Sequence, residues 1–106
     1  MSQRIRERDE LIARGRALAA TKPLLERELT ITRRLASERS IPESELVRME
    51  LRVAENAGQT EVNTAAQISA DAAIAEATAR RDGAVFGFRA SAEEELAKTR
   101  AEIATV

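Results

Sequence analysis

The stretch that decides the fold is residues 37–43, which read Ser37-Glu38-Arg39-Ser40-Ile41-Pro42-Glu43. Ser40 and Glu43 have the spacing of a capping box, in which each side chain accepts a hydrogen bond from the other residue's backbone N–H. Pro42 then falls in the first turn of a helix, where its missing N–H costs nothing. Because the residue before a proline avoids helical geometry, Ile41 marks a break between two helices. A connection this short makes the helices antiparallel neighbours, which predicts a helical hairpin with its tip at about residues 38–43.

The first arm of this hairpin covers about residues 3–38 and carries leucines at seven-residue intervals. Such a row is typical of a coiled-coil seam. The apolar residues that form it are Leu11, Leu18 and Leu25, accompanied by Ile5, Ile12, Leu29 and Leu35. Pro23 interrupts the row, and a proline inside a helix kinks or breaks it. Two alternatives follow: a single kinked helix, or two helices at about 3–20 and 22–38 with Thr21 as the N-cap of the second.

The second arm covers about residues 42–104 and changes character along its length. Its seam begins with Leu46 and Val53 and a companion row of Met49, Leu51 and Ala54. The apolar positions of residues 65–79 are then mostly Ala, apart from Ile68 and Ile74, and Ala buries little area per residue. A final apolar row comprises Val85, Phe88, Ala92, Leu96, Thr99, Ile103 and Val106. Since the second arm is longer than the first, either the chain folds back near Gly83–Gly87, or residues from about 82 onward pack on another chain or on further sequence. We favour the second alternative.

The composition supports an elongated helical protein rather than a compact globule. The sequence has 106 residues, of which 33% are charged, and only 2% are aromatic. Ala, Glu, Arg and Leu dominate, which is typical of coiled coils and long helices. The prediction is therefore an all-α chain in which residues 1–106 form one hairpin domain. The formal net charge is −1, so we expect no nucleic-acid partner.

The sequence lacks the residues on which most catalytic and metal sites depend. It contains no His and no Cys, which removes the commonest general base, the thiolate nucleophile and most zinc ligands. We therefore expect no catalytic, cofactor-binding or metal-binding residue, and no enzymatic activity. No apolar run approaches the length of a membrane span, and no signal peptide is expected within residues 1–106.

Several segments resemble the HlyD family of periplasmic adaptors, the membrane fusion proteins of type I secretion systems. The first is 25–35, which reads Leu-Glu-Arg-Glu-Leu-Thr-Ile-Thr-Arg-Arg-Leu, followed by 41–46 and 48–53 around Glu43, Glu45 and Leu46. Two later segments, 73–77 and 88–96, are similar to the family's Ala-rich and Phe-Arg stretches. The tip glycine of the family falls on Arg39, and its tip serine falls on Pro42.

The resemblance implies a role in protein export. It implies a hairpin that projects into the periplasm from a larger protein anchored in the inner membrane. Several copies of that protein would link an ABC transporter, contacted by other parts of the parent, to a TolC-like outer-membrane channel that meets the tip. Partner-contact residues would then be Leu35, Arg39, Ser40, Ile41, Pro42 and Glu43, with Arg33 or Arg34 behind them.

Plainer interpretations of the same residues remain open. Leu35 also suits an ordinary seam position, and Ser40 and Pro42 also suit simple helix capping. The alternative function is a generic coiled-coil oligomerisation module, in which residues 37–43 serve only as a turn.

Overall fold

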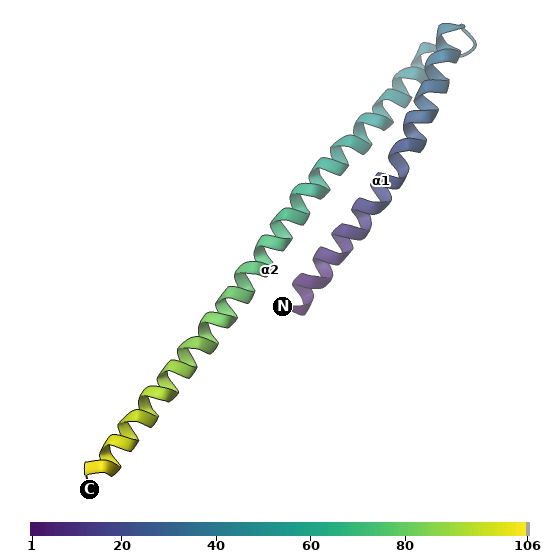
Figure 1. Ribbon diagram of the computed structural model, residues 1–106. Helices are drawn as coiled ribbons and strands as arrows, with labels where there is room; N and C mark the ends of the chain where they lie inside the picture. Colours follow the sequence, from purple (N-terminus) through teal and green to yellow (C-terminus); the bar gives the residue numbers. More distant parts are fainter. Residues whose placement is uncertain (106) are drawn as a thin grey trace.

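The computed structural model describes residues 1–105 and consists of two helices, α1 (Ser2–Ser37) and α2 (Glu43–Thr105). The helices lie antiparallel and are joined by a turn at residues 38–42, as Figure 1 shows. The molecule is a rod whose principal extents are 101 × 16 × 15 Å. The predicted all-α antiparallel hairpin is therefore confirmed. Of the final apolar row, Val106 lies outside the described residues.

The apolar part of the seam lies nearest the tip. Leu25, Leu29 and Met49 are buried, and Leu46 and Val53 pack against them. Along α2, the residues turned toward α1 recur at alternating steps of three and four, as a heptad seam requires. These buried or half-buried positions are Leu46, Met49, Val53, Asn56, Thr60, Asn63, Gln67, Ala70, Ile74 and Ala77. The prediction that Leu51 and Ala54 belong to the seam is wrong, because both are exposed on the opposite side of α2.

The middle of the seam is polar. Asn56 and Asn63 are 7% and 5% exposed, and each donates its side-chain amide to a backbone carbonyl of α1. The Asn56 amide reaches the Leu18 carbonyl at 3.3 Å, and the Asn63 amide reaches the Leu11 carbonyl at 2.9 Å. These bonds satisfy the two buried amides, which would otherwise cost about 1–3 kcal/mol each.

Gly15 explains why the bond from Asn63 is the shorter one. A Cβ atom at Gly15 would lie 2.6 Å from Oδ1 of Asn63 and 2.8 Å from Nε2 of Gln67. The absent side chain leaves room for the Asn63 amide beside α1, where Gln67 also donates to Oδ1 of Asn63 at 2.6 Å. Gly15 therefore allows the closest polar contact between the two helices.

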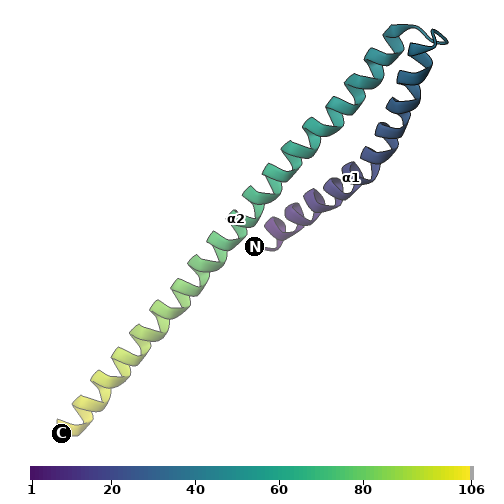
Figure 2. The ribbon, with the colours of Figure 1, turned by 45° about the horizontal axis from the view of Figure 1, so that its top comes forward.

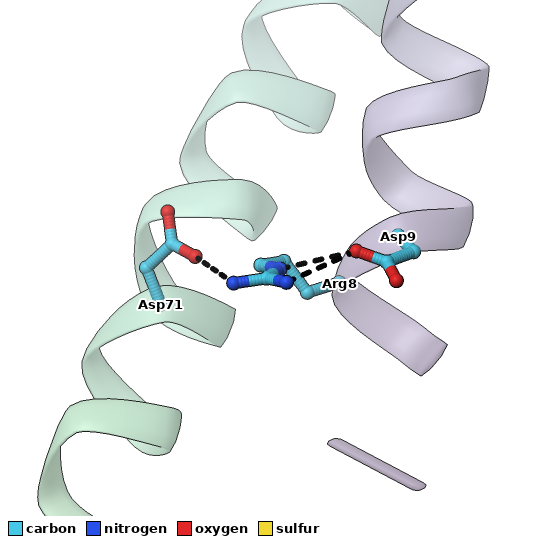
Figure 3. A network of polar contacts seen from close by, with 3 residues as sticks. All are labelled: Arg8, Asp9 and Asp71. Atoms are coloured by element: carbon cyan, nitrogen blue, oxygen red, sulfur yellow. Dashed lines mark hydrogen bonds and ion pairs between the residues drawn. The ribbon is translucent and has the colours of Figure 1, made fainter. Parts of the chain in front are cut away.

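Two ion pairs link the helices on either side of this polar stretch. Nearer the tip, Arg52 lies 3.7 Å from Glu28. At the other end, Arg8 extends from α1 toward Asp71 of α2 at 3.9 Å and also contacts Asp9 at 3.1 Å, as Figure 3 shows. All of these side chains keep substantial exposure, so each pair contributes about 0–1 kcal/mol.

Pro23 lies inside α1 without ending it. Of the two alternatives that the sequence left open, the structure has the single helix, and Figure 2 shows that its purple and blue halves run in different directions. A bend is the expected response, since the proline ring removes one backbone N–H and crowds the preceding turn. Thr21 is not an N-cap: its hydroxyl donates to the Ala17 carbonyl within the helix at 2.9 Å.

α2 extends well beyond the N-terminus of α1 (Figure 1). It continues without a break through Gly83 and Gly87, so the alternative in which the chain folds back there is wrong. Every described residue from Ala79 onward is exposed, including Phe86 and Phe88. Packing of this part on another chain or on further sequence stays a prediction. Within residues 1–105, neither helix is long and apolar enough to cross a membrane.

Candidate partner-contact site at the hairpin tip

The tip is shaped by the way α1 ends. The backbone N–H of Arg39 donates to the Ala36 carbonyl at 3.0 Å, and that of Ser40 donates to the Leu35 carbonyl at 2.8 Å. These two bonds make a Schellman motif, which satisfies the last carbonyls of a helix and reverses the chain. The motif needs its C′ residue in the left-handed region, and Arg39 has φ of 60°. The turn at residues 38–42 is thus a fixed structure.

Arg39 is an unusual residue for this position. The left-handed conformation brings the Cβ of an L residue close to its own carbonyl and costs about 1–2 kcal/mol, whereas glycine adopts it freely. The HlyD-family resemblance places a glycine here, and this chain has an arginine instead. The arginine side chain is exposed, so no packing inside the hairpin offsets the strain. Strained residues of this kind are concentrated at functional sites.

The start of α2 differs from the prediction. The helix begins at Glu43, so Pro42 immediately precedes the first helical residue and its carbonyl accepts the Glu45 N–H at 3.1 Å. Among residues 1–105, no hydrogen bond joins the Ser40 or Glu43 side chain to the backbone of the other, so the expected capping box is wrong. Glu43 and Glu45 instead lie in the first turn, where carboxylates favour the positive end of the helix dipole.

The six predicted contact residues lie together at one end of the rod. Leu35 and Ile41 are half-buried, and the Leu35 carbonyl also accepts the hydrogen bond from the Ser40 N–H that closes the turn. The exposed members are Arg39, Ser40, Pro42 and Glu43. The tip therefore offers a guanidinium, a hydroxyl and a carboxylate on a rigid convex turn, beside the partly exposed edge of Ile41. Groups that reach outward in this way suit contact with another protein's surface.

The residues described, 1–105, contain no group of three or more His, Cys, Asp or Glu side chains placed to hold a metal ion. Hydrogen bonds at the tip are those of the turn itself, such as the Ser37 hydroxyl donating to the Arg34 carbonyl at 2.7 Å. What this arrangement can do is present side chains to a partner.

Sequence reasoning missed the polar residues of the seam: Asn56 and Asn63, which bond to α1, and Gln67, which bonds to Asn63. A signal for two of them was present, because Asn56 and Asn63 follow Met49 at seven-residue intervals. That phase places them in the same row as the buried Met49. Their acceptors could not be anticipated, since backbone carbonyls of a neighbouring helix leave no trace in the sequence.

Comparison with known proteins gives one result. A family model described as "AprE, long alpha-helical hairpin" matches residues 1–106. No curated protein and no solved structure matches the chain.

Proposed function

The chain belongs to the AprE long alpha-helical hairpin family, and from this premise we propose that it is the periplasmic hairpin of a type I secretion adaptor. Its role is to bridge an ABC transporter of the inner membrane and a TolC-like channel of the outer membrane. The hairpin tip docks on the channel. Other parts of a longer, membrane-anchored parent contact the transporter. The role is mechanical and non-catalytic.

The observation that carries this proposal is the strained, exposed arginine at the end of a long rod. A turn that only reverses the chain is most stable with glycine at its left-handed position. Arg39 occupies that position at a cost of about 1–2 kcal/mol, and its exposed guanidinium carries a fork of charged donors. A carboxylate or backbone carbonyl of a partner would recover this cost through a charge-assisted hydrogen bond.

The shape of the rod fits the same role. The extent of 101 Å comes mainly from α2, whose 63 residues span about 95 Å at 1.5 Å per residue, and α1 packs along the part of α2 nearest the tip. The tip lies at the end where the seam is most apolar, with Leu25, Leu29 and Met49 buried. A firm seam there holds the turn rigidly, so that docking does not have to order a mobile loop.

The substitution Arg39→Gly tests the proposal because it separates folding from docking. Relief of the left-handed strain should raise the free energy of unfolding by about 1 kcal/mol. Loss of a charged hydrogen bond, worth about 1.5–3 kcal/mol, should lower the affinity for the channel about tenfold or more, and export should fall with it. Export of the substrate by cells carrying the variant in the parent protein measures the second effect.

The matched control is Arg14→Ala, which removes an exposed arginine from α1 far from the tip. Export should then stay at the level of the unmodified protein. If Arg39→Gly exports as well as Arg14→Ala, tip docking is refuted. The generic coiled-coil module, in which the turn has no partner, then becomes the better interpretation.

A further inference from the structure

The two parts of α1 on either side of Pro23 contact α2 in different ways. We call residues 2–22 the base half of α1 and residues 24–37 the tip half. The tip half contributes the two buried leucines of the apolar cluster, Leu25 and Leu29. Of residues 2–22, all of which the structure describes, none is buried. Separating the tip half from α2 would therefore expose an apolar core to water, whereas separating the base half would expose side chains that water already reaches in part.

The specific contacts between the base half and α2 are polar. The Asn56 side chain donates to the Leu18 carbonyl at 3.3 Å. The Asn63 side chain donates to the Leu11 carbonyl at 2.9 Å. The ion pair between the helices that Figure 3 draws joins partly exposed side chains at 3.9 Å. Since a carbonyl within a helix also accepts an N–H from its own helix, these carbonyls lose only a second bond when the helices part, and water can replace the bonds of the amides.

The seam beside these two amides is open to water along one side. A groove of about 360 Å³ between the helices is lined in part by Asn56, and another of about 300 Å³ is lined in part by Asn63. Arg14 and Gln59 line both grooves, which therefore adjoin. Closely packed interiors have few voids larger than a water molecule, so this side of the seam is not closely packed. An amide that leaves its carbonyl here meets water at once.

α1 has a weak point where the base half meets the tip half. Pro23 has no backbone N–H, so the Ala19 carbonyl receives no hydrogen bond from the residue four positions later. Two residues before the proline, the Thr21 hydroxyl donates to the Ala17 carbonyl at 2.9 Å, an arrangement that slightly destabilises a helix and often bends it. The bend of α1 is visible in Figure 2. These two defects lie within three residues, 21–23, which we call the joint.

We propose that the base half of α1 separates from α2 as a unit, turning at the joint, while the tip half stays packed. In the open form α2 keeps its backbone hydrogen bonds, and the side chains of Asn56 and Asn63 face water. The hairpin thus combines a rigid tip with a base that opens. Opening is a property of the hairpin itself. Only its use, which is to let the base move while a docked tip stays fixed, rests on the proposed function.

Hydrogen exchange at the asparagine side chains, followed by NMR, measures the opening directly. The side-chain amide of Asn63 can exchange whenever the base half leaves α2, whereas the backbone N–H of Leu29 in the apolar cluster requires the tip half to open as well. The proposal predicts a protection factor at least tenfold lower for the Asn63 side chain than for the Leu29 N–H. Equal protection at the two sites would mean that the hairpin opens only as a whole, and would overturn the proposal.

Comparison of the two asparagines distinguishes opening at the joint from gradual fraying of α1. If the base half leaves as a unit, the side chains of Asn56 and Asn63 should have protection factors that agree within about threefold. Fraying from the N-terminal end of α1 would instead leave Asn56, which lies nearer the joint, much better protected than Asn63. Such a gradient would contradict a joint at residues 21–23.

Pro23→Ala tests the joint, because it restores the missing backbone N–H. Protection of the Asn63 side chain should rise at least tenfold, since the base half can then open only together with the tip half. The matched control is Gly58→Ala, which stabilises α2 at a position where no atom lies within 4 Å of the new Cβ and leaves the joint unchanged. The control should raise protection of the Leu29 N–H but change that of the Asn63 side chain less than twofold.

Equal changes at the Asn63 side chain in Pro23→Ala and Gly58→Ala, or no rise with Pro23→Ala, would overturn the proposed joint. Circular dichroism of each variant checks that the hairpin has folded. Because exchange is measured on the chain without a channel, a failure of tip docking leaves these results unchanged and refutes the proposed function alone.

Discussion

Replacing Gly15 by Ala should destabilise the hairpin, although alanine is the better helix former. Within a helix, Gly→Ala ordinarily gains about 1 kcal/mol. At Gly15, however, the new Cβ would lie 2.6 Å from Oδ1 of Asn63 and 2.8 Å from Nε2 of Gln67. Both side chains would have to move, which breaks the Asn63 bond to the Leu11 carbonyl and the Gln67 bond to Asn63.

The expected magnitude follows from these losses. Each hydrogen bond contributes about 0.5–1.5 kcal/mol, and a buried amide left without a partner costs about 1–3 kcal/mol. Against the gain of about 1 kcal/mol in helix propensity, the net result is a loss of about 1 kcal/mol. For a domain of this size the melting temperature should fall by about 4–8 °C.

Gly58→Ala is the matched control, because no atom lies within 4 Å of a Cβ built there. This variant should gain about 1 kcal/mol, so the two substitutions shift the melting temperature in opposite directions. Thermal unfolding followed by circular dichroism measures both. In a background of Asn63→Ala, Gly15→Ala should become stabilising. If Gly15→Ala stabilises the unmodified chain as much as Gly58→Ala does, the close polar contact at Gly15 is not present.

Three further substitutions test the seam, each by thermal or denaturant unfolding. Leu29→Ala should cost about 2–4 kcal/mol, because Leu29 is buried against Met49 near the tip, and a cost below 1 kcal/mol would contradict that core. Asn56→Ala should cost about 1 kcal/mol through loss of its bond to the Leu18 carbonyl, and a neutral result would show that the bond contributes nothing. Pro23→Ala should raise stability by about 1–3 kcal/mol and straighten α1, whereas a loss of stability would mean that the bend is required for packing.

The sequence was sufficient to predict the hairpin because its main helix-breaking residues lie together in one short stretch. Pro42 and the residues around it interrupt two long amphipathic patterns, and only one arrangement of two helices with so short a connection is possible. The rows through Leu25, Leu29 and Met49 identified the apolar seam near the tip. The cap at the start of the second helix was harder to predict. Ser40 and Glu43 have the spacing of a capping box, but the helix begins at Glu43 and not three residues before it.

Two features could not be predicted because they depend on three-dimensional contacts. The left-handed conformation of Arg39 arises from the Schellman bonds at the end of α1, whereas the residue type alone argues against it. The polar seam depends on Gly15 lying opposite Asn63, and this pairing becomes visible only when the register of the two helices is known. The six tip residues lie at one end of the rod, and their contact with a partner stays a prediction.

The measurement that tests tip docking most directly is site-specific disulfide formation between the hairpin and the periplasmic end of the outer-membrane channel. One cysteine replaces Ser40 in the parent protein, and the control replaces Thr64, an exposed residue in the middle of α2. Each is paired with cysteines introduced on the channel. Docking by the tip predicts disulfides from position 40 and none from position 64. Disulfides from both positions, or from neither while export continues, would contradict it.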